Sequence, residues 1–244
     1  MSRNFELLTQ IESEVGTMDH RIPAATYRAV VKAVAPSDAG DVGGEEMLRL
    51  IQSIFLSANG NAPRKVVFCG VDSENGSSSV CASAGRTLAA NSARSVCLVD
   101  ANLRSPRLSG IFGVDTTIPS LGKSASVREQ CTQLGGNLWL AGTDLLTDDR
   151  GALQSVDELK KLTAHLRGAF EYVLIDAPGA GISGDAAILG QVADAAVLVI
   201  EADSTRRMSA RKAKEALDTA GVRLLGTVLH NRNFPIPAGL YKRL

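Results

Sequence analysis

The chain has 244 residues, of which 45% are hydrophobic, so it can bury a core in one large domain or two small ones. Its 26 basic residues balance its 26 acidic residues, and this zero net charge argues against a protein that mainly binds nucleic acid. The longest apolar run, Val192 to Ile200, is interrupted by Asp194 and falls short of the about 20 residues that a membrane-spanning helix needs. The first ten residues include Glu6 and lack a long apolar run, so we expect no secretory signal.

Four cysteines are present, and none forms a Cys-x-x-Cys pair. They are Cys69, Cys81, Cys97 and Cys131. This spacing favours free thiols over a zinc site, and it fits a protein of the reducing cytoplasm.

The chain begins with a segment that differs from the rest. In residues 1–40, four apolar side chains recur at helical spacing before a looser stretch that contains Ala and Pro: Phe5, Leu8, Ile11 and Val15. We interpret this segment as a docking arm or a partly ordered leader. The domain proper is expected over residues 41–231, followed by a tail over residues 232–244.

A helix is predicted over Gly44–Ala58, because an apolar stripe recurs there at 3.6-residue periodicity. The stripe consists of Met47, Leu50, Ile51 and Ile54. The side chains of Glu46, Arg49 and Gln52 fall on another face of the same helix.

Beyond Lys65, short apolar segments alternate with helical patterns. The predicted strands are Val66–Gly70, Val96–Val99, Leu138–Ala141, Tyr172–Ile175, Ala196–Ile200 and Leu224–Leu229. Strands that are apolar on both faces and alternate with helices predict a mostly parallel sheet in a three-layer α/β sandwich. Ligands of such sheets bind at the carboxyl ends of the strands.

A loop suited to phosphate follows the first of these strands. Residues 71–79 read Val-Asp-Ser-Glu-Asn-Gly-Ser-Ser-Ser and open a helix, where backbone N–H groups can hold an anion. Gly76 and Ser78 match the P-loop pattern, whereas Val71 replaces its first glycine and Ser77 its lysine. The predicted nucleotide-binding residues in this loop are Asn75, Gly76, Ser77, Ser78 and Ser79.

Two apolar strands each end in an aspartate. Asp100 follows Val96–Val99, and Asp176 follows Tyr172–Ile175. Parallel strands bring both carboxylates to one edge of the sheet, so we predict catalytic roles for both and a Mg²⁺ site that they share with Ser78.

These motifs resemble those of the bacterial tyrosine kinases of capsule and exopolysaccharide assembly, a deviant-Walker P-loop family related to the Min and Par ATPases. Asp100 begins Asp-Ala-Asn-Leu-Arg-Ser-Pro, which is similar to the family's A′ motif with Asn102 in place of an aspartate. Asp176 resembles the Walker B acid. Glu46-x-x-Arg49-x-x-Gln52 resembles the helix through which subunits of the family contact one another.

The resemblance implies Mg-ATP as cofactor, with Asn102 and Arg104 beside the nucleotide. It also implies a homo-oligomer, and a membrane-embedded polysaccharide co-polymerase or chain-length regulator as partner at the inner membrane. Members phosphorylate a tyrosine-rich tail, whereas Tyr241 is the lone tyrosine of this tail.

Three functions stay open at this stage. The first is a kinase-like regulatory subunit of polysaccharide synthesis or export with weak or lost catalysis, because Ser77 carries no charge for the phosphates. The second is an active tyrosine autokinase of the same family. The third is a Min/Par-type positioning ATPase, whose additional signature lysine is missing between Gly70 and Ser79.

Overall fold

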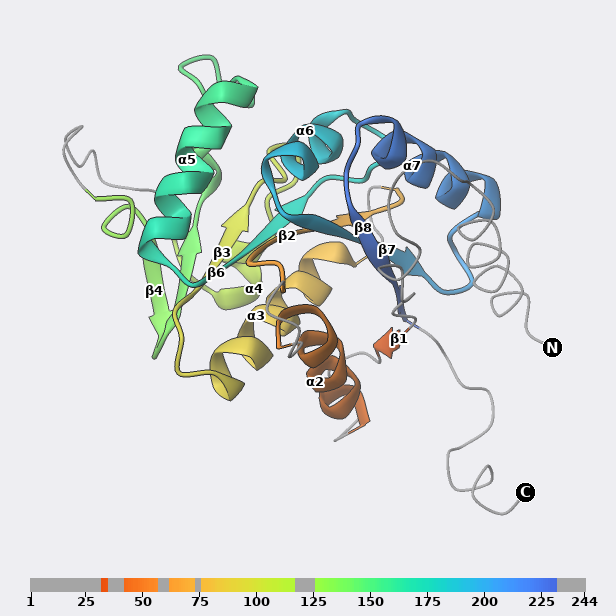
Figure 1. Cartoon of the computed structure of the whole chain (residues 1–244), viewed down its shortest axis with the longest axis horizontal. Coiled ribbons are helices and arrows are strands. Elements are labelled where there is room, and N and C mark those ends of the chain that lie inside the picture. The colour runs from red at the N-terminus through yellow and green to blue at the C-terminus, as the bar shows by residue number, and fades with distance from the viewer. Residues whose placement is uncertain (1–31, 35–41, 57–61, 73–75, 117–125, 232–244) are drawn as a thin grey trace.

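The computed structural model describes residues 32–34, 42–56, 62–72, 76–116 and 126–231 (Figure 1). The helices are α2 (Val42–Phe55), α3 (Ser77–Asn91), α4 (Leu108–Phe112), α5 (Val156–Ala169), α6 (Asp185–Val192) and α7 (Arg207–Thr219). The strands are β1 (Lys32–Val34), β2 (Lys65–Gly70), β3 (Val96–Asp100), β4 (Thr132–Gly135), β5 (Leu138–Ala141), β6 (Tyr172–Ala177), β7 (Ala195–Glu201) and β8 (Leu224–His230).

The described strands form one eight-stranded sheet in the order β1-β8-β7-β2-β6-β3-β5-β4. All neighbours pair in parallel except β4, which pairs antiparallel with β5 at one edge. The predicted mostly parallel α/β fold is therefore confirmed. Parallel strands need crossover connections, and helices form most of these connections. The helices lie on both faces of the sheet, with α5, α6 and α7 above it and α2 and α3 below it in Figure 1.

The central strands contribute side chains to two hydrophobic cores, because successive side chains point to opposite faces of the sheet. In β2, Val67 and Cys69 pack with α5, α6 and α7, whereas Val66 and Phe68 pack with α2 and α3. The central strands are buried over nearly their whole length. This double burial explains why they read as continuous apolar runs.

The observed elements include several that were not predicted, mostly short ones. The predicted helix over Gly44–Ala58 is observed as α2, and its four-residue apolar stripe is buried as expected. β1, which the sequence had not indicated, lies within the predicted leader and pairs with β8, the predicted strand over Leu224–Leu229. α4, β4 and α6 were also not anticipated. The predicted helix around Phe5–Val15 lies outside the described residues, and the division of the chain into leader, domain and tail stays a prediction.

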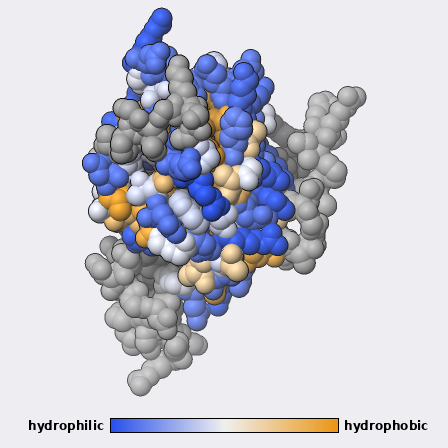
Figure 2. All heavy atoms as spheres, turned by 90° about the vertical axis from the view of Figure 1, so that its left-hand side faces the viewer, coloured by the Kyte–Doolittle hydropathy of each residue, from blue (hydrophilic) through white to orange (hydrophobic). Residues whose placement is uncertain are grey.

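The surface on the side of α5 and β4 is mainly hydrophilic, with small separate apolar areas (Figure 2). In the part of the chain that the structure describes, no helix combines the length and the apolar character that crossing a bilayer requires.

Candidate functional site

Three adjacent strands bring the predicted site together. β2 leads into the phosphate loop, β6 carries Asp176, and β3 carries Asp100. β6 lies between the other two, and its Asp176 is in register with Asp100 on one side and with Phe68 on the other. The predicted convergence of the two carboxylates at one edge of the sheet is therefore observed in the structure.

Asp176 is the most unusual polar side chain of the described core. It is fully buried, and neither carboxylate oxygen accepts a hydrogen bond of normal geometry from the described residues. Burial raises its pKa to about 7, the nearby Ser78 and Ser77 hydroxyls oppose this rise, and the Asp100 charge adds to it. Native proteins rarely leave a buried carboxylate without partners, so this group is a candidate ligand for a cation.

Asp100 is also buried, but backbone groups satisfy it. Its Oδ2 accepts the N–H of Leu108 at 2.9 Å, and its Oδ1 accepts the N–H of Asn102 at 3.3 Å. Burial raises the Asp100 pKa, and these hydrogen bonds lower it. Asn102 is buried as well, and its Oδ1 accepts the N–H of Ser105 at 3.3 Å, so it shapes the turn after β3.

The N-terminus of α3 supplies the anion-binding half of the site. Gly76 is the N-cap residue and lies in the left-handed region, so it offers no side chain to the first turn, and no acidic residue lies in that turn. The first N–H groups are therefore available to an anion. The Ser78 hydroxyl and the Ser77 hydroxyl lie close enough to Asp176 to lower its pKa, so this helix end meets the buried carboxylate.

Both the backbone conformation and the neighbouring side chain favour glycine at position 76. It has φ +70, and a Cβ atom at this position would collide with the imidazole ring of His230, at the end of β8. The Nδ1 atom of His230 is buried without a hydrogen-bond partner among the described residues. Burial lowers the His230 pKa, and the Glu201 charge opposes this effect. The neutral imidazole therefore closes one side of the loop.

The segment after β6 is fixed against the start of the phosphate loop. The N–H of Ala180 donates to the carbonyl of Gly70 at 2.9 Å, and the N–H of Gly181 donates to the carbonyl of Val71 at 3.0 Å. A Cβ at Gly179 would lie 2.5 Å from the Asp72 carbonyl oxygen. Only glycine permits this close approach, which holds the Asp176 strand end against the loop.

The remaining predicted nucleotide-binding residues lie on the surface or outside the described part of the chain. Ser79 is exposed on the first turn of α3, and Arg104 is exposed on the turn after β3. Asn75 lies outside the described residues. The charge of Arg107 lowers the Asp176 pKa, so Arg107 is a cation at the site that motif reading missed. His230 was missed also, because only the folded sheet brings it to Gly76.

The predicted subunit-contact residues share the outer side of α2. Arg49 and Gln52 are exposed, Glu46 is partly exposed, and the apolar stripe faces the core. Arg49 forms a 3.4 Å ion pair with Glu45, in which both side chains remain about two-thirds exposed. This face is available for contact, although its role in an oligomer stays a prediction.

The residues present fit a hydrated Mg²⁺. This ion takes oxygen ligands, usually one or two carboxylates completed by hydroxyl, water and phosphate oxygens. Asp176 offers two unpartnered oxygens, and the Ser78 hydroxyl lies beside it. No cluster of three or more His, Cys, Asp or Glu side chains suited to a metal occurs in the described ranges, so a metal held by protein ligands alone is not indicated there.

Several known proteins with similar sequences are tyrosine-protein kinases. The match to the tyrosine-protein kinase YwqD of Bacillus subtilis is 34% identical over 150 residues and covers 59% of this chain and 62% of that protein. The match to the tyrosine-protein kinase CpsD of Streptococcus agalactiae is 29% identical and covers 56% of this chain and 62% of that protein. The chain is therefore similar in sequence to bacterial tyrosine kinases. The resemblance carried by its motifs is thus confirmed, although the matches span less than two thirds of either relative, and no family model matches.

Solved structures of other proteins share the fold of this chain. The chimeric protein CapA2B2 aligns with a TM-score of 0.74 at 17% identity, over 93% of this chain and 100% of that one. The kinase domain of Escherichia coli ETK gives 0.66 at 18% identity, over 93% and 89%. The MinD protein of Aquifex aeolicus gives 0.53 at 22% identity, over 73% and 72%. The P-loop fold shared with Min proteins is confirmed, and the agreement with the kinase domains is more extensive.

Proposed function

We propose that this chain is a cytoplasmic, kinase-like P-loop subunit that binds Mg-ATP and has weak or lost phosphotransfer activity. The observation that carries the proposal is the buried carboxylate of Asp176, which has no hydrogen-bond partner of normal geometry among the described residues and lies beside the N-terminus of α3, where Gly76 offers no capping side chain. A cation at Asp176 would neutralise the carboxylate and the charge of a phosphate bound at the helix N-terminus. Mg-ATP provides both groups in P-loop proteins.

Weak catalysis follows from the residue at position 77. A P-loop lysine brings a full charge to the β- and γ-phosphates, whereas the Ser77 hydroxyl lies toward Asp176. Each hydrogen bond to a charged group contributes about 1.5–3 kcal/mol, so the loss of the ammonium removes a large part of transition-state stabilisation. Mg-ATP binding would then control the conformation of the chain and its assembly with other subunits, and phosphotransfer would be weak or lost.

The cellular role is inferred from the kinase relatives. We place the chain in synthesis, chain-length control or export of a bacterial exopolysaccharide, at the inner membrane through a membrane-embedded co-polymerase. The exposed outer side of α2, with Glu46, Arg49 and Gln52, supports a further role in a homo-oligomer.

The test is a phosphotransfer and hydrolysis assay with radiolabelled ATP and the purified full chain. We expect Mg-dependent ATP binding with turnover near the blank. Turnover that disappears in Asp100→Ala would contradict weak catalysis and establish an active kinase or ATPase. Absence of ATP binding would overturn the proposal itself.

An active autokinase is the second candidate, and Arg107 favours it. Its positive charge lowers the pKa of Asp176, so a cation acts on the site although position 77 carries no charge. An active autokinase would incorporate label from ATP into Tyr241, which lies outside the described residues, and a Tyr241→Phe variant would lose it. A Min/Par-type ATPase would instead release phosphate without labelling the chain.

A further inference from the structure

The first half of α7 carries a cluster of basic side chains on its exposed side. The buried residues Ala210, Ala213 and Leu217 attach this helix to the core, so the direction of its outer side is fixed. Residues 204–214 contain five basic side chains and no acidic one, although the chain as a whole has no net charge. Four of these side chains are fully exposed, and we call them the basic patch: Arg206, Arg207, Arg211 and Lys212.

The fold itself makes little use of the basic patch. Arg211 forms an exposed ion pair with Glu215 at 3.0 Å, whereas the other three members form no ion pair among the described residues. Arg206 is the N-cap residue and Arg207 begins the helix, and no acidic residue lies in the first turn. Because the helix dipole disfavours cations at this end, the stability of α7 does not explain these charges.

An exposed apolar side chain lies within the basic patch. Met208 is 62% exposed, which makes it an unusually accessible large hydrophobic residue of the described chain. It follows Arg207 directly, and its i, i+4 spacing from Lys212 places both on one side of the helix. A flexible apolar side chain among cations suits the boundary between the headgroups and the acyl chains of a bilayer, where charge attraction and apolar burial act together.

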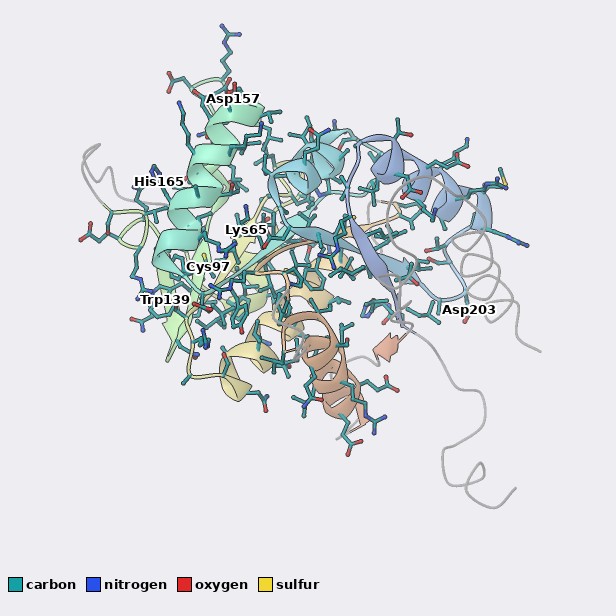
Figure 3. The ribbon with its side chains drawn as sticks, viewed as in Figure 1. Lys65, Cys97, Trp139, Asp157, His165 and Asp203 are labelled. Atoms are coloured by element: carbon teal, nitrogen blue, oxygen red, sulfur yellow. The ribbon has the colours of Figure 1, made fainter. Side chains whose placement is uncertain are left out.

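The position of α7 leaves this side of the molecule accessible to a large partner. α7 lies at one end of its helical layer, and α5 lies at the other end (Figure 1). Asp203, in the turn that leads into α7, and Asp157 and His165 of α5 mark these two ends in Figure 3. Positions 207 to 212 span about 7.5 Å along the helix axis. Cations spread in this way contact a broad anionic surface together, whereas a small anion meets only one or two of them.

We propose that the basic patch and Met208 bind the surface of a bilayer that contains anionic phospholipid. The cations lie at the headgroup phosphates, and Met208 enters the boundary below them. The apolar face of α7 stays in the protein core, so the contact is peripheral and reversible. This contact with lipid is separate from the proposed contact with a membrane-embedded partner, and it does not depend on nucleotide binding.

Duplex DNA is the other large anionic surface that meets such a patch, and it fits less well. DNA offers no apolar layer to Met208, which is exposed among the cations. Proteins that mainly bind DNA also carry an excess of basic residues, whereas this chain has equal numbers of basic and acidic residues. The combination of local cations with an exposed apolar side chain therefore favours lipid.

The test measures sedimentation of the purified full chain with phosphatidylcholine vesicles that contain or lack phosphatidylglycerol. We expect binding only to the vesicles with phosphatidylglycerol, and we expect added salt to weaken it. Each basic residue near such a bilayer raises affinity about fivefold, so Arg207→Gln with Lys212→Gln should lose about 25-fold. Lys160→Gln with Lys161→Gln, at exposed positions of α5, removes the same charge and should bind as wild type does.

A change at Met208 separates the apolar contribution from the electrostatic one. Met208→Ser should lose roughly fivefold in affinity, because less apolar surface is buried in the bilayer. Its salt dependence should match that of wild type, since all four members of the basic patch remain. Unchanged affinity in Met208→Ser would contradict the insertion of this side chain.

A measurement on the wild-type chain keeps the proposal open to refutation if a variant folds poorly. The first N–H groups of α7 have no partner within the helix, so they exchange hydrogen rapidly without lipid. Vesicles with phosphatidylglycerol should slow exchange over residues 204–212 and leave α5 unchanged. Equal binding to neutral vesicles, equal losses in the two double variants, or protection confined to other segments would overturn the proposal. Binding of the basic patch to duplex DNA or to a second copy of the chain, without binding to vesicles, would also overturn it.

Discussion

The two halves of the candidate site differ in how completely they are built. The carboxylate half has two buried aspartates in register on neighbouring strands, and Asp176 has no hydrogen-bond partner of normal geometry in the part of the chain that the structure describes. The phosphate half has an uncapped helix N-terminus and a left-handed glycine, but Ser77 stands in place of the charged residue that an intact P-loop has. The comparison teaches that the binding of a cation and the catalysis of phosphotransfer make separate demands, and that this chain meets the first more fully.

The largest expected effect concerns the carboxylate half, through Asp176→Asn. Folded Asp176 keeps its proton up to about pH 7, whereas an unfolded chain loses it near 3.8, so the stability of the wild type falls as pH rises through that range. The full difference is on the order of 4 kcal/mol. We expect the ligand-free variant to melt roughly 8–16 °C above wild type at pH 8 and to lack this pH slope.

Melting curves at pH 5 and pH 8 check this prediction, with Asp157→Asn as the control at an exposed carboxylate. A variant that melts at or below the wild-type temperature at pH 8 would show that the ionised, buried Asp176 does not destabilise the folded chain.

The second effect tests the phosphate half, through Gly76→Ala. The added methyl group meets the His230 ring, and alanine is strained at φ +70, so we expect a loss of about 3 kcal/mol of stability. His230→Ala in the same chain should restore part of that loss, which a double-mutant cycle from urea unfolding measures. Gly184→Ala is the control, since no atom lies within 4 Å of its added Cβ. Equal losses at the two glycines would refute the contact.

The third effect asks whether the missing charge alone limits the phosphate half. Ser77→Lys should tighten ATP binding at least tenfold, because an ammonium hydrogen bond to phosphate contributes about 1.5–3 kcal/mol. Ser79→Lys places the same charge on the exposed side of the same helical turn and should change binding little. If both lysines tighten binding equally, general electrostatic attraction explains the result, and the loop geometry does not.

The smallest expected effect on stability lies outside both halves, at Arg49→Glu on α2. Its ion pair with Glu45 is exposed, so the change in unfolding free energy should stay within about 0.5 kcal/mol. Sedimentation of the ATP-loaded chain should nevertheless show weaker self-association than wild type. Lys212→Glu on the exposed side of α7 is the control, and similar weakening by both changes would argue against a specific α2 interface.

Much of the carboxylate half could be predicted from the sequence, because it depends on local pattern. An apolar run that ends in aspartate predicts both the strand and the edge at which Asp100 and Asp176 meet. β4 was missed because its residues, Thr-Gln-Leu-Gly, alternate in burial at a sheet edge and show no apolar run. His230 and Arg107 were missed because their roles depend on contacts between distant segments, which leave no periodic signal.

Mg-dependent ATP binding by calorimetry tests the central claim most directly, with wild type and Asp176→Asn measured at pH 7 in two buffers of different ionisation enthalpy. The account predicts that wild type binds ATP with Mg²⁺ and releases a fraction of a proton as Asp176 becomes ionised beside the cation. Chelation of Mg²⁺ and Asp176→Asn should each weaken binding at least tenfold. Binding that is indifferent to Mg²⁺ and unchanged in Asp176→Asn would contradict the account.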